Sequence, residues 1–223
     1  MLFIAFFASF LSLAHATAGS SGVVMPGATP LPKGEGSAGL FAAGIHTSNW
    51  PTTFFGLTGS LGLRNDWSVQ GLIAPEFISG TWDSNRFVLA TAFRKNVHAS
   101  SHLNVAPYLS MYAEVIDFPD VFVAPGLALE GGWEHIRLDL SGAPLALWLG
   151  APLHGGPPFF PVIIPAVEGG ITGRIGAHHA VRLGGVLPTV TYRFTSDRFY
   201  LEGSYVNPLN DLWAWWVETG LRF

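Results

Sequence analysis

The sequence contains no cysteine, and this absence excludes disulfide bonds and metal sites built on thiolates. Charged residues make up only 12% of the 223 residues, and Lys33 and Lys95 are the two lysines. The formal net charge is −4 and no basic cluster occurs, which argues against a nucleic-acid partner. Hydrophobic residues reach 49%, yet no stretch approaches the roughly 18 uninterrupted apolar residues of a membrane-spanning helix.

Glycine and proline are plentiful and are scattered through the apolar parts of the chain. The 27 glycines and 16 prolines disfavour helices and favour short strands joined by turns. The length suits one domain or one barrel. A hydrophobic chain without spanning helices indicates an all-β, closed antiparallel transmembrane barrel, in which every second residue faces inward.

The first 36 residues differ from the rest. Residues 1–16 form an apolar run that closes with Ala14-His15-Ala16, which predicts a secretory signal peptide cleaved after Ala16. Residues 17–36 are rich in Gly, Ser, Pro and Thr and have no period, so we expect a flexible periplasmic lead-in. The barrel is then predicted over residues 37–223.

From Ser37 onward, apolar and polar residues alternate in short runs separated by turn residues. Residues 54–64 and 67–77 form a predicted hairpin around Asn65-Asp66. Bulges are expected near Gly142-Ala143-Pro144 and near Pro188, where the alternation slips. The candidate strands are 37–47, 54–64, 67–77, 86–94, 104–116, 121–133, 136–149, 159–176, 180–194, 198–206 and 213–223.

The last eleven residues, WAWWVETGLRF, show the alternation most clearly. One face carries Trp213, Trp215, Val217, Leu221 and Phe223, and the other face carries the charges. This segment resembles the C-terminal strand of bacterial outer-membrane β-barrels, whose assembly signal is an amphipathic strand ending in Phe. The resemblance implies outer-membrane lipid and the barrel-assembly machinery as partners. It also implies an even number of strands, so the eleven candidates become a prediction of ten or twelve.

The ionisable residues within the runs fall on the face opposite the apolar stripe. This parity predicts that they line the lumen, where seven arginines and six acids would form paired networks rather than an ion-selective ring. The predicted lumen charges are Arg64, Glu76, Arg86, Arg94, Glu130, Arg137, Asp139, Glu168, Arg174, Arg182, Glu202, Glu218 and Arg222. Aromatic girdles are expected from Trp67, Trp82, Trp133, Tyr205 and Trp213.

Prolines are the main argument for a different fold. Seven of them lie inside the runs, and each one in a closed barrel requires a bulge or a position beyond the hydrocarbon band. They favour the alternative of a secreted soluble β-sandwich. The seven are Pro75, Pro107, Pro125, Pro144, Pro161, Pro165 and Pro188.

A lipid-modifying enzyme is the second alternative. His98 and Ser100 lie two apart and Glu114 follows on the next run, so an acyl-transfer site could be built from them. The spacing is not diagnostic, and a polar loop explains His98 and Ser100 more simply. His178-His179 has poor metal geometry, because adjacent residues of a strand point apart. We therefore expect no enzyme, no metal and no cofactor.

The sequence predicts an integral outer-membrane barrel, either a narrow channel for small solutes or a structural and surface-interaction barrel. In the channel, solutes would diffuse past the inward Arg and acidic groups. The Gly- and Pro-rich loop 150–161 is the candidate for a surface contact or for lumen occlusion. Neither the solute nor the oligomeric state follows from the sequence.

Overall fold

The computed structural model describes residues 28, 31–47, 52–64, 66–78, 81–115, 120–143, 145–149, 159–162, 166–184, 188–209 and 212–223. The predicted signal peptide and most of the predicted lead-in lie outside these residues. The same holds for most of loop 150–161, whose last residues, Phe159 to Pro161, lie in a short strand.

Fifteen β-strands form one antiparallel sheet. They are β1 (Gly36–Thr47), β2 (Thr52–Gly62), β3 (Trp67–Ile78), β4 (Thr81–Lys95), β5 (Val97–Ser100), β6 (Leu103–Val115), β7 (Asp120–Gly132), β8 (Ile136–Ala143), β9 (Ala146–Leu149), β10 (Phe159–Val162), β11 (Ala166–Ile175), β12 (His179–Gly184), β13 (Thr189–Thr195), β14 (Phe199–Leu209) and β15 (Leu212–Arg222).

The sheet closes on itself because β1 pairs with β15 over eleven residues, from Ser37 opposite Arg222 to Thr47 opposite Leu212. Pairing of β6 with β7 completes the ring. Three short strands continue their neighbours: β5 extends β4 along β6, β9 extends β8 along β7, and β10 precedes β11. The result is a closed antiparallel barrel of twelve strands, and the predicted fold is confirmed.

The twelfth strand comes from the candidate run 180–194, which is two strands rather than one. β12 and β13 pair with each other, from His179 opposite Phe194 to Gly184 opposite Thr189. The predicted bulge at Pro188 is therefore wrong, because Pro188 lies in the reversal between two strands. Proline is common in such turns because it fixes φ and has no N–H to donate.

The predicted bulge near Pro144 is confirmed. β7 pairs Leu127 with Gly142 on one side of this position and Val123 with Leu147 on the other. Between these two pairs, three residues of β7 oppose four residues of the β8–β9 strand, which is one extra residue and defines a bulge. The alternation of inward and outward side chains resumes after it.

Three of the seven prolines within the predicted strands lie where a ladder of backbone hydrogen bonds is interrupted. Pro75 borders a register shift between β3 and β4. Pro107 lies between the pairings of β6 with β4 and with β5. Pro125 lies between the pairings of β7 with β8 and with β9. The missing N–H groups of these three prolines therefore break few ladder bonds, which weakens the argument for a soluble sandwich. Pro161 lies opposite Leu147 in the short ladder between β9 and β10, and Pro144 and Pro165 lie outside the described residues.

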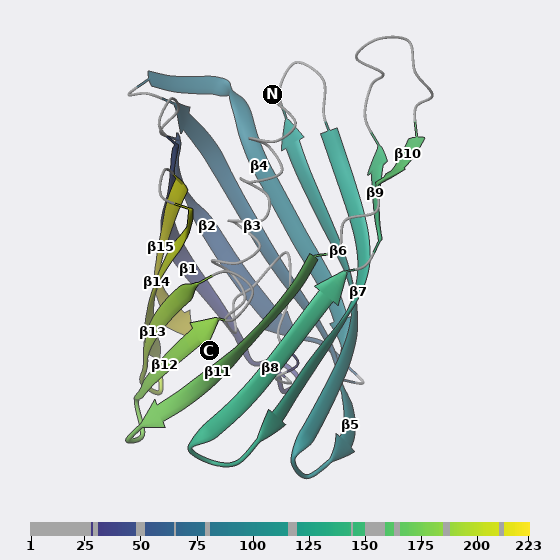
Figure 1. Cartoon of the computed structure of the whole chain (residues 1–223), viewed down its shortest axis with the longest axis vertical. Coiled ribbons are helices and arrows are strands. Elements are labelled where there is room, and N and C mark those ends of the chain that lie inside the picture. Colours follow the sequence, from purple (N-terminus) through teal and green to yellow (C-terminus); the bar gives the residue numbers. More distant parts are fainter. Residues whose placement is uncertain are drawn as a thin grey trace.

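The beginning of β1 and the end of β15 lie side by side at one end of the barrel, which we call the turn end. Gly36 and Phe223 exchange two backbone hydrogen bonds there, of 2.9 and 3.1 Å. The short turns that precede β3, β6, β8, β12 and β14 lie at the same end, at the bottom of Figure 1. Asp66 adopts a left-handed φ of 62° in the first of them, at the predicted Asn65-Asp66 turn.

Among the described residues, no helix is long and apolar enough to cross a membrane.

Candidate functional site: the lumen and the outer wall

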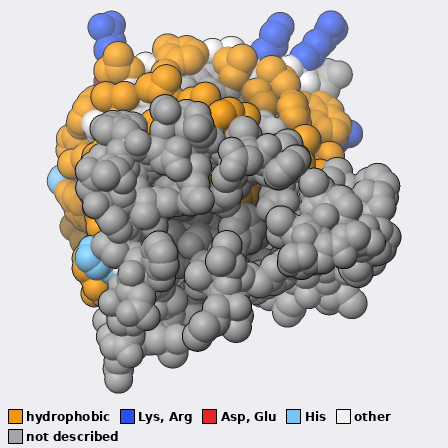
Figure 2. All heavy atoms as spheres, turned by 90° about the horizontal axis from the view of Figure 1, so that it is seen from above, with side chains coloured by type: hydrophobic (Ala, Val, Ile, Leu, Met, Phe, Trp, Pro, Cys, Tyr) orange, Lys and Arg blue, Asp and Glu red, His pale blue; other side chains and the backbone are white. Residues whose placement is uncertain are grey.

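The outer wall of the barrel is apolar around its whole circumference. Every one of the twelve barrel strands presents at least one large hydrophobic side chain that is more than a third exposed. Figure 2 shows hydrophobic side chains along the described part of the periphery that is visible from above. Exposing so continuous an apolar surface to water is unfavourable, whereas the lipid-facing surface of a membrane barrel is apolar. Examples, one from each strand, are Leu40, Leu57, Ile73, Leu89, Leu109, Leu127, Leu138, Ile171, Leu183, Val190, Leu201 and Val217.

Aromatic side chains border this apolar wall at both ends. At the turn end, Trp133 is 70% exposed and the ammonium of Lys95 lies 6.0 Å from the ring centroid of Trp67. At the opposite end, Trp213 stacks on His46 with centroids 4.3 Å apart and lies beside Tyr205. Trp213 of β15 and the following Phe223 are ten positions apart. This spacing is about 33 Å of extended chain, or about 25 Å along the barrel axis at a strand tilt near 40°.

The outward face of β15 carries the residues predicted as the assembly signal. Val217, Leu221 and Phe223 are exposed, and Trp213 and Trp215 are half-buried on the same face. Trp215 packs its indole over Gly44 of β1, where a Cβ atom would come within 2.3 Å of Nε1. The recognition of this face by an assembly machinery stays a prediction.

Inward side chains near the turn end form what we call the polar belt. It consists of Thr58, Ser68, Gln70, Arg94, Glu130, Arg137, Asp139, Arg182, Arg193, Glu202 and Glu218. Four arginines and four carboxylates balance within it. The predicted charge-paired lumen thus corresponds to a ring at one height of the barrel, on strands β2 to β15.

Two ion pairs lie on the β7, β8 and β12 side of the belt. Nη1 of Arg137 donates to Oε1 of Glu130 at 2.7 Å. Arg182 binds both carboxylate oxygens of Asp139, with Nε to Oδ1 at 3.0 Å and Nη2 to Oδ2 at 2.5 Å. The bidentate geometry fixes the guanidinium plane. Gly170 makes room for it, because a Cβ atom there would come within 2.7 Å of Cζ.

The β13, β14 and β15 side holds a more deeply buried group. Nε of Arg193 donates to Oε2 of Glu202 at 2.5 Å, and the Glu202 side chain is 1% exposed. The strand register places Glu202 directly opposite Glu218, which is also 1% exposed. Oε1 of Glu218 accepts hydrogen bonds from the Tyr200 hydroxyl at 2.6 Å and the Thr58 hydroxyl at 2.8 Å. One arginine and two hydroxyl groups thus help to hold these two adjacent carboxylates in place.

Beyond the belt, away from the turn end, most of the described inward side chains are apolar, and Ser110, Thr189, Thr191 and Ser204 add buried hydroxyl groups. Trp216 stacks on Phe41 with ring centroids 4.4 Å apart and planes 9° apart. Phe54, Leu72, Ala74, Val88 and Val206 are also inward and buried. A molecule in the lumen would therefore meet a mostly apolar stretch and then a charged ring.

Six of the predicted lumen charges are not placed in the belt. Arg64, Arg174 and Arg222 are exposed at the turn end, because Arg64 lies in a turn and the other two lie at the last residues of their strands. For these three the lumen prediction is wrong in position, although Arg174 and Arg222 have the inward parity. The side chains of Glu76, Arg86 and Glu168 lie outside the described part of the chain.

Arg193 is a belt residue that the parity argument missed. A single strand over 180–194 that directs Arg182 inward directs Arg193 outward, since the two differ by an odd number of positions. The reversal at Pro188 changes the parity, and both arginines then point inward. Gly184 followed by Pro188 is the signal that would have divided the run.

The proposed acyl-transfer site is not assembled. His98 is paired with Asn104 at the beginning of β6, whereas Glu114 lies ten residues further along the same strand. About 33 Å of extended chain therefore separates the acid from the histidine backbone. The Ser100 hydroxyl instead accepts the backbone N–H of His102 at 3.3 Å. In the described ranges, no group of three or more His, Asp or Glu could hold a metal ion.

No protein-family model and no curated protein matches the chain. Among solved structures it is similar to the KdgM porin in complex with disordered oligogalacturonate, with a TM-score of 0.55 and 8% identity over 83% of this chain and 99% of that chain. It is also similar to the TodX deltaS2S3 mutant monoaromatic hydrocarbon channel, with a TM-score of 0.40 and 10% identity over 86% and 90%. The outer-membrane protease OmpT from Escherichia coli gives 0.28 and 7% over 85% and 95%. The first likeness shows a shared barrel fold.

Proposed function

We propose that the protein is an integral outer-membrane barrel that forms a narrow channel for small solutes. The single observation that carries this proposal is the arrangement of the wall, which is apolar outside all twelve strands and has a charge-paired ring inside. That division suits lipid on one side and a polar passage on the other. The fold shared with a porin supports it.

The number of strands favours a passage over a completely filled interior. Eight strands enclose just enough space for their own side chains, and the diameter grows with strand number. Twelve strands enclose more, and many inward positions carry only a methyl or hydroxymethyl group. Examples are Ala74, Ala90, Ala106, Ala124, Ala128, Ser68, Ser110 and Ser141.

The polar belt is the ring of described charged side chains that a solute would pass. Because its four arginines and four carboxylates balance, neither cations nor anions gain a large electrostatic advantage within it. Bidentate pairing also holds the Arg182 guanidinium against the wall. We therefore expect weak ion selectivity and a preference for small neutral or zwitterionic solutes.

The test is single-channel conductance of the chain from Thr17 in a planar bilayer, after boiled and unboiled samples have been shown to migrate differently on a gel. Discrete steps with a reversal potential near zero in a salt gradient are expected. Glu130→Gln should shift the reversal potential toward anion selectivity, because it leaves one positive charge unbalanced in the belt. Asp197→Asn, at an exposed turn, is the matched control and should cause no shift. A folded but silent barrel would refute the channel.

A second function is favoured by one observation. Gln70, Glu202, Trp216 and Glu218 are at most 1% exposed, as expected of a lumen closed by its contents. A barrel whose lumen is occluded by its own side chains would serve as a structural or surface-interaction protein. It would fold and show the gel shift, and it would not conduct.

A further inference from the structure

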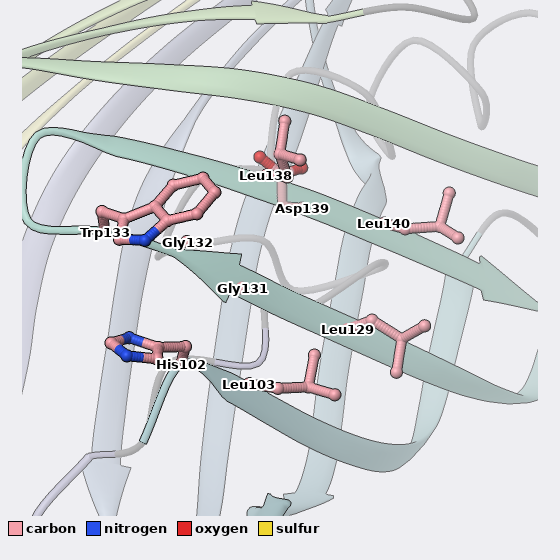
Figure 3. A pocket seen from close by; sticks show the side chains of 9 residues that line it. All are labelled: His102, Leu103, Leu129, Gly131, Gly132, Trp133, Leu138, Asp139 and Leu140. Atoms are coloured by element: carbon pink, nitrogen blue, oxygen red, sulfur yellow. The ribbon is translucent and has the colours of Figure 1, made fainter. Parts of the chain in front are cut away.

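A hollow lies on the outer wall at the turn end, between β6, β7 and β8 (Figure 3). It is an open depression with a volume of about 400 Å³. Its centre is Gly131, an outward position of β7 whose register partners are Leu103 on β6 and Leu138 on β8. The missing side chain at Gly131 leaves the gap. Leu129 on β7 and Leu140 on β8 extend the lining of the hollow away from the turn end.

The rim of the hollow at the turn end carries two nitrogen-bearing rings. His102 comes from the turn before β6, and Trp133 comes from the turn after β7. Backbone hydrogen bonds hold both turns: Gly132 N–H donates to His102 O at 3.0 Å, and Trp133 N–H donates to Ile136 O at 2.8 Å. Gly132 has a φ of +145°, and a Cβ atom there would come within 2.3 Å of Ile136 O. The backbone of both turns is therefore held in place.

The hollow is continuous with the apolar outer wall, and its leucines are part of that wall. Leu103, Leu138 and Leu140 are 39%, 52% and 46% exposed. If the barrel lies in a membrane, as proposed above, this face lies in lipid. A flexible acyl chain can fill such a gap, whereas the surrounding wall offers only a convex surface.

Charge at the same end suits a phosphate group. The exposed basic residues of the described chain gather at the turn end and outnumber the exposed acids there by six to four. The basic residues are Lys33, Arg64, Lys95, Arg174, Arg198 and Arg222, and the acids are Glu35, Asp66, Glu134 and Asp197. Arg174 belongs to the neighbouring hairpin, and its backbone N–H donates to His135 O at 2.9 Å, next to the rim. Indole N–H groups at a membrane boundary donate to headgroup oxygens.

We propose that this hollow is a binding site for one membrane phospholipid, with an acyl chain over Gly131 between the leucines and the phosphate at His102 and Trp133. The inference requires the membrane placement proposed above and is independent of conductance. A silent barrel could still hold the lipid, and a conducting barrel could lack it.

The experiment is native mass spectrometry of the folded barrel, released from mild detergent after incubation with phosphatidylglycerol. The wild type should retain one lipid under collisional activation that removes the others. Gly131→Leu should weaken retention by about tenfold or more, because loss of packing around two methylene groups already has that effect. Its new Cβ atom lies 3.0 Å from His102 O, so a small adjustment suffices.

Gly173→Leu is the matched control. Gly173 is also an outward strand glycine, on β11, and no atom lies within 4 Å of a Cβ atom built there. It should retain the lipid like the wild type. If Gly131→Leu fails to fold, as judged by the gel shift, Leu140→Trp fills the hollow from an exposed position and should give the same loss.

Diacylglycerol, which lacks the phosphate, tests the headgroup contact. It should be retained several-fold less than phosphatidylglycerol by the wild type and equally poorly by His102→Ala. Equal retention of phosphatidylglycerol by the wild type, Gly131→Leu and Leu140→Trp would overturn the site. Equal retention of the two lipids by the wild type would overturn the phosphate contact.

Discussion

Arg193 offers the sharpest test of how the lumen is held together. Among the described residues, Arg193 is the cation that binds Glu202. The Glu202 side chain is 1% exposed, and its Oε1 has no hydrogen-bond partner among those residues. Glu202 in turn faces Glu218 across the β14–β15 ladder. Replacing Arg193 by Met keeps the bulk of the side chain and removes its charge. The buried Glu202 carboxylate would then lie opposite that of Glu218 without the arginine that binds it.

The expected cost is large. Removing one member of a buried ion pair costs about 3–5 kcal/mol, because the remaining charge stays desolvated. Arg137→Met is the matched control, because the two arginines are similarly exposed, at 34% and 26%, whereas the carboxylate left behind is 10% exposed for Glu130 and 1% exposed for Glu202. Its partner Glu130 also interacts electrostatically with Arg94, so a charge remains to offset it. A loss of about 1 kcal/mol or less is expected there.

The assay is equilibrium unfolding in urea of the barrel refolded into lipid vesicles, followed by tryptophan fluorescence. Combining Arg193→Met with Glu202→Gln should restore most of the lost stability, because the second change removes the stranded charge. Equal losses for Arg193→Met and Arg137→Met would refute the reasoning. So would a double variant as unstable as the single one.

Two further predictions concern packing inside the lumen, and the same unfolding assay checks both. Tyr200→Phe removes the 2.6 Å hydrogen bond to buried Glu218 and should cost about 1.5–3 kcal/mol, whereas Tyr205→Phe, on the exposed outer wall, should stay within about 0.5 kcal/mol. Unchanged stability of Tyr200→Phe would contradict this account of Glu218. Gly126→Ala places a Cβ atom 2.1 Å from Cζ of Tyr108 and should cost about 1–3 kcal/mol, whereas Gly71→Ala, with its nearest atom at 3.8 Å, should cost less. A cost that persists in a Tyr108→Ala background would show that the tyrosine ring is not the cause.

Much of the barrel could be predicted because a lipid-facing sheet repeats one simple rule. Outward residues such as Leu57, Ile73 and Leu201 must be apolar, and their neighbours face the lumen. Period 2 therefore appears in the sequence wherever a strand is regular. The eleven candidate runs correspond to the twelve strands, with one run divided.

The errors arise where parity is interrupted, because alternation carries no information across a reversal. A bulge and a tight turn both shift parity at a proline, and the sequence does not distinguish them. Between Gly142 and Leu147 the chain continues after a bulge, whereas at Pro188 it reverses. Arg193 was lost from the predicted lumen for this reason alone.

Height along the barrel is the second quantity that alternation leaves open. Parity places Arg222 and Glu218 on the same face, yet one is exposed at the rim and the other is buried inside. Partner choice depends on register between distant strands, as for Thr58 and Glu218, which are 160 residues apart. Such pairs follow from closure of the ring, which no local pattern encodes.

The seam between β1 and β15 has a consequence for how the barrel can be rebuilt. It joins neighbouring strands that no loop connects, and its eleven residue pairs make it one of the longest ladders in the wall. Residues Gly36 and Phe223 are already hydrogen-bonded across it. A short linker could therefore join them, and new chain ends could be opened at a turn such as 196–198. A circular permutant of this kind would move the unlinked seam around the barrel and leave every strand neighbour unchanged.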